Sequence, residues 1–205
     1  MKARTFSWLC LVGGALIVAA ACTSSKPVAP PAPAPPPVDY RLTATIKDLM
    51  DSVVDPSSDY LWESVATIVT KAGTEERRPR TEEQWKEVRR RAIALIEAPN
   101  LLIMEGRKVA KPGEKSENPG IELGPEEIQA VIDGDRLTFM QRAHALQDAG
   151  LKALAAIDAK NVEGLSDAGE TIDEACEQCH LKYWYPPDAA DRLKAGAGSV
   201  RKKQS

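Results

Sequence analysis

The sequence predicts an all-α fold, specifically an antiparallel up-down-up-down four-helix bundle. Between Tyr40 and Tyr185 no sustained alternation of polar and apolar residues marks a strand. Apolar residues instead recur at spacings of three and four in four long stretches. The connections between these stretches are mostly short, which favours antiparallel neighbours in a bundle.

The first two helices each carry one apolar stripe. Helix one is expected from Leu42 to Gly73, with a kink or short break at Pro56 because proline removes a backbone donor. Helix two begins after Thr81 with a Thr-Glu-Glu-Gln capping-box pattern and continues to Leu102.

The second pair of helices follows a turn-rich loop at residues 106–124 that contains two Pro-Gly pairs. Helix three starts at Pro125, a favourable first helical residue, and is expected to continue for over thirty residues, to Ile157. Helix four has the most regular stripe, and two of its cysteines fall on it. The stripe consists of Val162, Leu165, Gly169, Ile172, Cys176 and Cys179.

Composition narrows the classes of function. The 205 residues include 27 basic and 30 acidic side chains, a formal net charge of -3, so the chain lacks the basic field that nucleic-acid binding needs. The 43% of hydrophobic residues can bury a core. With two histidines and four cysteines, any metal chemistry must use few residues.

The N-terminus predicts export. Residues 1–21 combine Lys2 and Arg4 with an apolar run of sixteen residues, shorter than the roughly 20 of a membrane span. The small residues before Cys22 resemble the lipobox of bacterial lipoproteins, which implies that Cys22 is acylated. The alternative is ordinary cleavage after Ala21, which would release a soluble periplasmic protein.

Residues 22–39 are expected to be a lipid-anchored linker, because they hold seven of the fifteen prolines. At about 3.1 Å per residue, polyproline II would place a domain at residues 40–187 about 30 Å from the membrane. Thr23 stands where some bacteria use aspartate for inner-membrane retention, which favours the outer membrane. Residues 188–205 are expected to form a flexible tail.

The strongest chemical signal is Cys-Glu-Gln-Cys-His at residues 176–180, the C-x-x-C-H pattern of c-type haem attachment. On a helix, positions i, i+3 and i+4 share one face. Cys176 and Cys179 can therefore form thioethers with one haem while His180 reaches its iron as an axial ligand. Export agrees with this chemistry, because bacteria attach c-type haem outside the cytoplasm.

Three other interpretations compete for the motif. A thioredoxin-like redox pair needs a βαβ context, which the helical pattern lacks. A structural zinc site needs about four ligands, but His144 is the only other histidine. The third interpretation is a chance match on a buried helix stripe.

A haem motif near the end of the last helix of a bundle resembles class II cytochromes c, the cytochrome c-prime fold. The resemblance covers residues 40–187 and depends most on residues 176–180 and on Ile-Lys-Asp-Leu-Met at 46–50, followed by Pro56. It implies that the haem lies between helices four and one. In the low-spin branch a methionine of helix one is the sixth ligand, which corresponds to Met50. High-spin relatives leave the iron five-coordinate.

Bundle geometry also bears on the sixth ligand. Antiparallel packing brings the start of helix one, with Met50, and the end of helix two, with Met104, to the haem end of helix four. Met140 and His144 lie over roughly 20 Å from that end at 1.5 Å per residue, and His144 is expected at the surface. From spacing alone, Met50 fits a core position equally well.

The motif and the resemblance lead us to expect a non-enzymatic, periplasm-facing monohaem cytochrome that carries single electrons through a His/Met-ligated iron. Its expected partners are periplasmic or membrane redox proteins and, through the lipid anchor, a membrane, and it could form a homodimer. One alternative is a gas-binding haem protein, for NO or CO, with an open or labile sixth position. Another is a haem-free structural lipoprotein.

Overall fold

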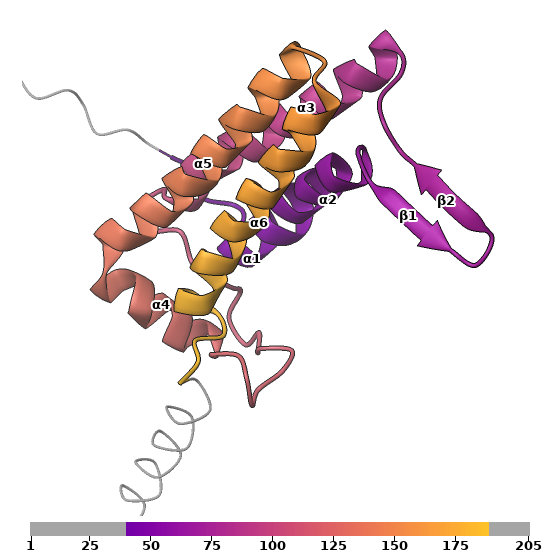
Figure 1. Ribbon diagram of the computed structural model, residues 1–205. Coiled ribbons are helices and arrows are strands. Elements are labelled where there is room, and N and C mark those ends of the chain that lie inside the picture. Colours follow the sequence, from indigo (N-terminus) through magenta and orange to yellow (C-terminus); the bar gives the residue numbers. More distant parts are fainter. Residues whose placement is uncertain (1–39, 189–205) are drawn as a thin grey trace, which may run out of the picture. The chain divides into compact units, whose positions relative to one another are not determined.

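The computed structural model describes residues 40–188, and this part of the chain is mostly helical (Figure 1). The expected export signal, Cys22 and the proline-rich linker lie outside the described residues, as does the tail from residue 189. The elements are α1 (Ile46–Leu49), η1 (Met50–Val54), α2 (Asp55–Glu63), β1 (Thr67–Thr70), β2 (Gly73–Glu76), α3 (Glu82–Leu102), α4 (Pro125–Gly134), α5 (Arg136–Asp158) and α6 (Val162–Tyr183).

The first helical stretch is continuous but changes its hydrogen-bond pattern. It starts at a capping box in which the Thr45 hydroxyl accepts from the Asp48 amide at 3.1 Å. The π-helical segment η1 follows, and the amide of Asp55 donates to the carbonyl of Met50. Pro56 lies in the first turn of α2. The expected interruption at this proline therefore takes the form of a π-helical segment immediately before it.

Helix one does not extend to Gly73 as expected. The helix ends at Glu63, and β1 and β2 form an antiparallel hairpin that projects away from the helices (Figure 1). The four residues of β1 are Thr-Ile-Val-Thr, whose β-branched side chains favour a strand. Gly73 has φ +139°, a conformation that suits glycine at the end of the turn. Local preference for strand therefore outweighs the spacing of three and four here.

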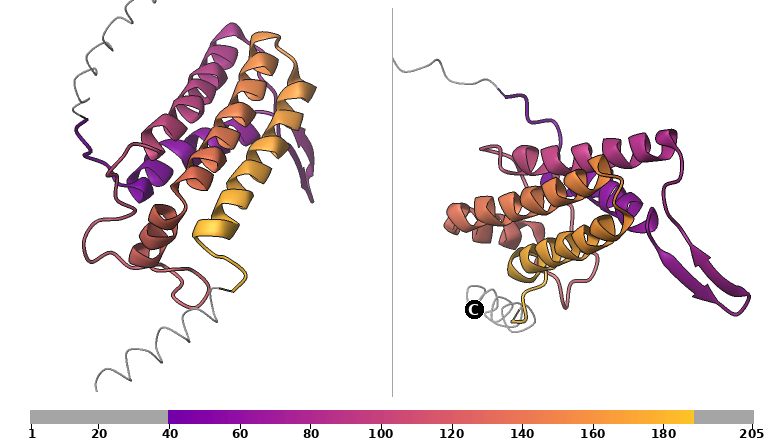
Figure 2. Two further views of the ribbon diagram at one scale, coloured as in Figure 1. Left: turned by 90° about the vertical axis from the view of Figure 1, so that its left-hand side faces the viewer. Right: turned by 45° about the horizontal axis from the view of Figure 1, so that its top comes forward.

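Helix three is also not a single helix. The chain leaves the helical conformation at Asp135, with φ -142° and ψ 60°, which separates α4 from α5. The Asp135 side chain accepts from the amide of Thr138 at 3.2 Å and caps α5. Gly134 before this aspartate is the local signal for the break, since glycine commonly ends a helix and aspartate begins one. As a result α4 lies beside the ends of α5 and α6 (Figure 2).

The predicted helices two and four are confirmed as α3 and α6. The Thr81 hydroxyl accepts from the Gln84 amide at 3.2 Å, completing the capping box of α3. Asn161 caps α6 by accepting from the Gly164 amide at 3.0 Å. Gly150 permits α3 and α5 to approach closely, because an added Cβ would lie 2.8 Å from Cγ1 of Ile96.

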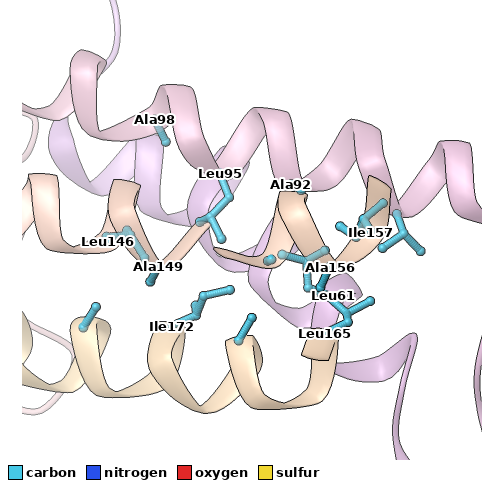
Figure 3. Packing of buried hydrophobic residues seen from close by; sticks show 14 of the residues in the cluster. Leu61, Ala92, Leu95, Ala98, Leu146, Ala149, Ala156, Ile157, Leu165 and Ile172 are labelled. Atoms are coloured by element: carbon cyan, nitrogen blue, oxygen red, sulfur yellow. The ribbon is translucent and has the colours of Figure 1, made fainter. Parts of the chain in front are cut away.

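The main core lies where α2, α3, α5 and α6 meet (Figure 3). Trp62 connects α2 to α6, because its indole Nε1 donates to the Gly169 carbonyl at 3.0 Å. A second apolar cluster contains residues of α1, α3, α4, α5 and α6 together with Val109. Within residues 40–188, no helix combines the length and apolar character of a membrane span.

Candidate functional site

A cavity of about 330 Å³ adjoins the second apolar cluster. Its volume is within the range of roughly 300–1,000 Å³ that is typical of small-molecule sites. The walls come from α1, η1, the start of α2, α4, α5, α6 and the loop between α3 and α4. The apolar wall residues include Ile46, Val109, Leu123, Ile128, Ile132 and Phe139.

The cavity brings together most of the predicted site residues. Cys179 and His180 line it from α6, and Met50 lines it from the first residue of η1. Cys176, one turn earlier on α6, is half-buried against the main core. The two cysteines are close enough for charge on one to raise the pKa of the other. A thioether, an imidazole and a thiol therefore converge from two helices that are over a hundred residues apart in sequence.

The other candidate ligands do not line this cavity. The thioether sulfur of Met104 lies 3.0 Å from Nη2 of Arg107 instead. Met140 is on α5 outside the cavity wall, and His144 is exposed as expected. Met140 and His144 both follow the break at Asp135, so the break does not bring either of them into the cavity wall.

Both thiols of the motif are neutral at neutral pH. Burial raises the pKa of Cys176 to about 12, and the charges of Cys179, Asp55 and Asp173 act in the same direction. Burial raises the pKa of Cys179 to about 11. Because disulfide exchange proceeds through the thiolate, these cysteines are poorly suited to thiolate redox chemistry.

His180 favours the neutral imidazole, the form that ligates metals. Burial lowers its pKa, although the carboxylates of Asp55 and Glu177 oppose this shift. The ring meets Trp184 edge-on, with centroids 5.0 Å apart, and Tyr185 lies 5.8 Å away. These aromatic contacts hold the imidazole at the cavity.

One part of the cavity wall is polar and charged. Asp51 and Asp55 line it from η1 and α2, and burial raises the pKa of Asp55. Lys47 pairs with Glu117 at 3.3 Å across the cavity edge, and Lys115 lies nearby on the same loop. An apolar chamber with a charged edge suits an apolar ligand that carries polar or charged groups at one end.

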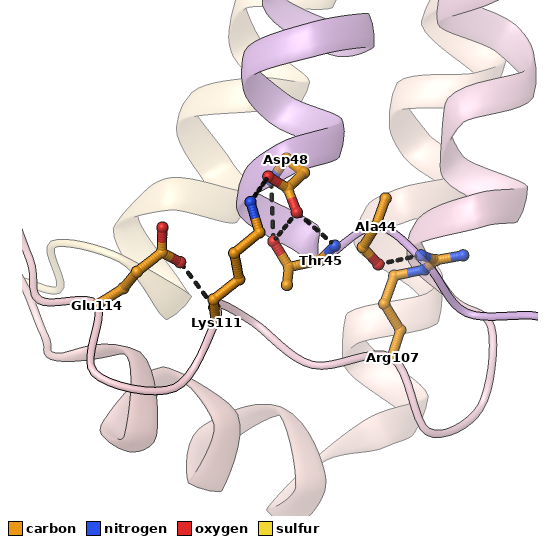
Figure 4. A network of polar contacts seen from close by, with 6 residues as sticks. All are labelled: Ala44, Thr45, Asp48, Arg107, Lys111 and Glu114. Carbon is orange, nitrogen blue, oxygen red and sulfur yellow. Dashed lines mark hydrogen bonds and ion pairs between the residues drawn. The ribbon is translucent and has the colours of Figure 1, made fainter.

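The loop after α3 is fixed to the start of α1 (Figure 4). Its backbone carbonyls at Lys108 and Val109 accept from the amides of Ile46 and Lys47 at 2.8 and 2.9 Å. Nζ of Lys111 donates to Oδ1 of Asp48 at 2.7 Å, and this bond, with those from Thr45, lowers the pKa of Asp48 to about 2. Asp48, which completes the capping box of α1 with Thr45, therefore also holds a cavity wall in place.

This network predicts acid-sensitive stabilisation. The pKa of Asp48 falls from 3.8 to about 2 on folding, so its contribution is complete above pH 3.8 and is lost as the pH falls towards 2. Asp48→Asn should lower the free energy of unfolding at pH 7, and the difference from wild type should shrink below pH 4. Denaturant titrations from pH 2 to 7 measure this. Asp148→Asn, at an exposed site, should show little loss, and an equal loss for Asp48→Asn at every pH would contradict a charge effect.

The sequence analysis did not find most of the cavity wall. Leu123 and Val109 lie in a segment that the sequence marks only as turn-rich, and Phe139 belongs to the helix that follows an unexpected break. Asp51 and Asp55 did carry a signal. Each follows the cavity residue Lys47 by a multiple of four positions, which places them on one face of a helix.

Comparisons with protein-family models, with curated proteins and with solved structures gave no significant match. Among the described residues, no group of three or more His, Cys, Asp or Glu side chains is placed to hold a metal ion.

Proposed function

We propose that this protein is a monohaem c-type cytochrome of the class II type that carries single electrons. The observation that carries the proposal is that Met50, Cys179 and His180 line one cavity, with Cys176 one helical turn away. The proposal includes the finer architecture of the family: α1 to α2 as one continuous helix, with α3, α5 and α6, would form an antiparallel four-helix bundle.

The residues present fit one covalently bound haem. The sulfurs of Cys176 and Cys179 would hold the group through thioethers, and the neutral imidazole of His180 would be the proximal iron ligand. Met50 would supply a thioether as the distal ligand. The apolar wall suits the macrocycle, and Lys47 and Lys115 would be the cations nearest to its carboxylates, beside the acidic side chains of Asp51 and Glu117 on the same edge.

Bound haem supplies an iron that alternates between the ferric and ferrous states. The protein controls what else can reach it. His180 and Met50 would both ligate the iron, so no substrate would need to bind. Wall residues such as Leu123 and Ile132, each 1% exposed, exclude water and would keep reorganisation on electron transfer small.

The wider setting belongs to the same proposal. Export, acylation at Cys22 and a proline-rich linker would hold the domain on the periplasmic side of a bacterial membrane, with the outer membrane preferred. Its partners would be periplasmic or membrane redox proteins. Cleavage before Cys22 would remove Lys2 and Arg4 and no acidic residue, so 25 basic and 30 acidic side chains would remain. The resulting net charge of -5 favours partners with a positive docking surface.

The test is to produce the full chain in a host that matures c-type cytochromes. We expect the intact mass of the processed chain plus one haem, and a low-spin c-type absorption spectrum. Cys176→Ser with Cys179→Ser is the control and should give protein without covalent haem. Colourless, unmodified wild-type protein from the same host would refute the proposal.

A further inference from the structure

Tyr183 is a residue of the cavity wall with a buried, unsatisfied hydroxyl. The residue is 4% exposed and lines the cavity, and its hydroxyl has no hydrogen-bond partner among residues 40–188. Buried hydroxyls are nearly always hydrogen-bonded, because an unpaired one has lost its bonds to water without replacement. Tyr183 therefore lacks a partner that a molecule in the cavity can supply.

The ring of Tyr183 is held in a defined position. Phe139, another wall residue, meets it edge-on with centroids 5.4 Å apart. The ring also contacts the ammonium group of Lys182, whose Nζ lies 5.6 Å from the ring centroid. These contacts restrict movement of the ring, so the hydroxyl cannot easily reach solvent to form a hydrogen bond with water.

The surroundings of Tyr183 keep its hydroxyl protonated and able to donate. The ionisable groups that face it come from two helices. They are Cys179 and Lys182 on α6, Asp135 at the start of α5, and Arg142 in α5. Asp135 is already bound to Lys182 at 2.7 Å. Burial is the main cause that raises the pKa of Tyr183 to about 12, so at neutral pH the phenol is protonated and can donate.

We propose that Tyr183 is a binding residue for the group in this cavity and donates its hydroxyl hydrogen to a carboxylate of that group. The inference depends on the proposed function, under which the acceptor is a haem propionate. A carboxylate is the strongest acceptor that haem presents at its edge, and hydrogen bonds to charged acceptors are the stronger kind. Within the part of the chain that the structure describes, the other buried hydroxyl without a partner is that of Ser58 on α2, which does not line the cavity.

The experiment compares Tyr183→Phe with two matched controls in the haem-loaded full chain. Tyr183→Phe should lower Tm by on the order of 5 °C, because a hydrogen bond to a charged group is lost. It should also lower the midpoint potential, because the propionate charge near the iron is no longer partly offset. Tyr60→Phe, outside the cavity, and Ser58→Ala, which removes the other orphaned hydroxyl, should leave the potential unchanged.

The outcomes separate this inference from the proposed function. Haem-loaded Tyr183→Phe protein with wild-type Tm and potential would overturn the role of Tyr183 alone. A fall in Tm without any change of potential would also overturn it, because that result indicates packing and not contact with the carboxylate. Wild-type protein without covalent haem would overturn both.

Discussion

Replacing Met50 with alanine in the haem-loaded protein is expected to abolish the methionine-to-iron charge-transfer band and to convert the iron from low spin to high spin. Met50 lines the cavity with His180, and its side chain is the proposed distal ligand. Without the thioether, the iron would be left five-coordinate, the potential would shift, and the reduced protein would bind carbon monoxide rapidly. Absorption spectra of both oxidation states, with and without carbon monoxide, measure the change.

Met104→Ala is the matched control for this experiment. Met104 lies outside the cavity wall, and its sulfur lies against the guanidinium of Arg107. Its replacement should leave the band, the spin state and the carbon monoxide reaction as in wild type. If Met50→Ala also leaves them unchanged, the ligand assignment is wrong. Rapid carbon monoxide binding by the wild type would favour the gas-binding alternative.

The largest effect on stability is expected from Leu95→Ala. Leu95 is 0% exposed on α3 and lies in the core that α2, α5 and α6 also form (Figure 3). Removing its side chain loses apolar burial and leaves a cavity, so the free energy of unfolding should fall by about 2–5 kcal/mol. Chemical denaturation of the haem-loaded protein, followed by circular dichroism, measures the change.

Leu137→Ala makes the same chemical change at a site that is 67% exposed on α5. We expect a change within about 0.5 kcal/mol there. Similar losses for the two variants would mean that Leu95 does not belong to a tightly packed core.

Sequence patterns were reliable where the relevant interactions are local. The capping box at Thr81 and the stripe of α6 each extend over neighbouring turns, so residue spacing alone predicted α3 and α6 closely. Spacing failed at Thr67–Thr70. In a short segment, apolar residues can lie three or four positions apart by chance, and the β-branched side chains there favour a strand. The break at Asp135 was missed although Gly134 and Asp135 are a stop and a start signal.

The sequence by itself determined that Cys176, Cys179 and His180 share a helix face, because residues three and four positions apart are neighbours on the surface of a helix. The resemblance around residues 46–50 made Met50 a candidate ligand, and spacing alone left a core role open. Only the tertiary structure decided that Met50 and His180 face one cavity, which Val109 and Phe139 help to enclose. Such walls depend on how helix ends and a long loop pack against each other, and no residue spacing within one element specifies that packing.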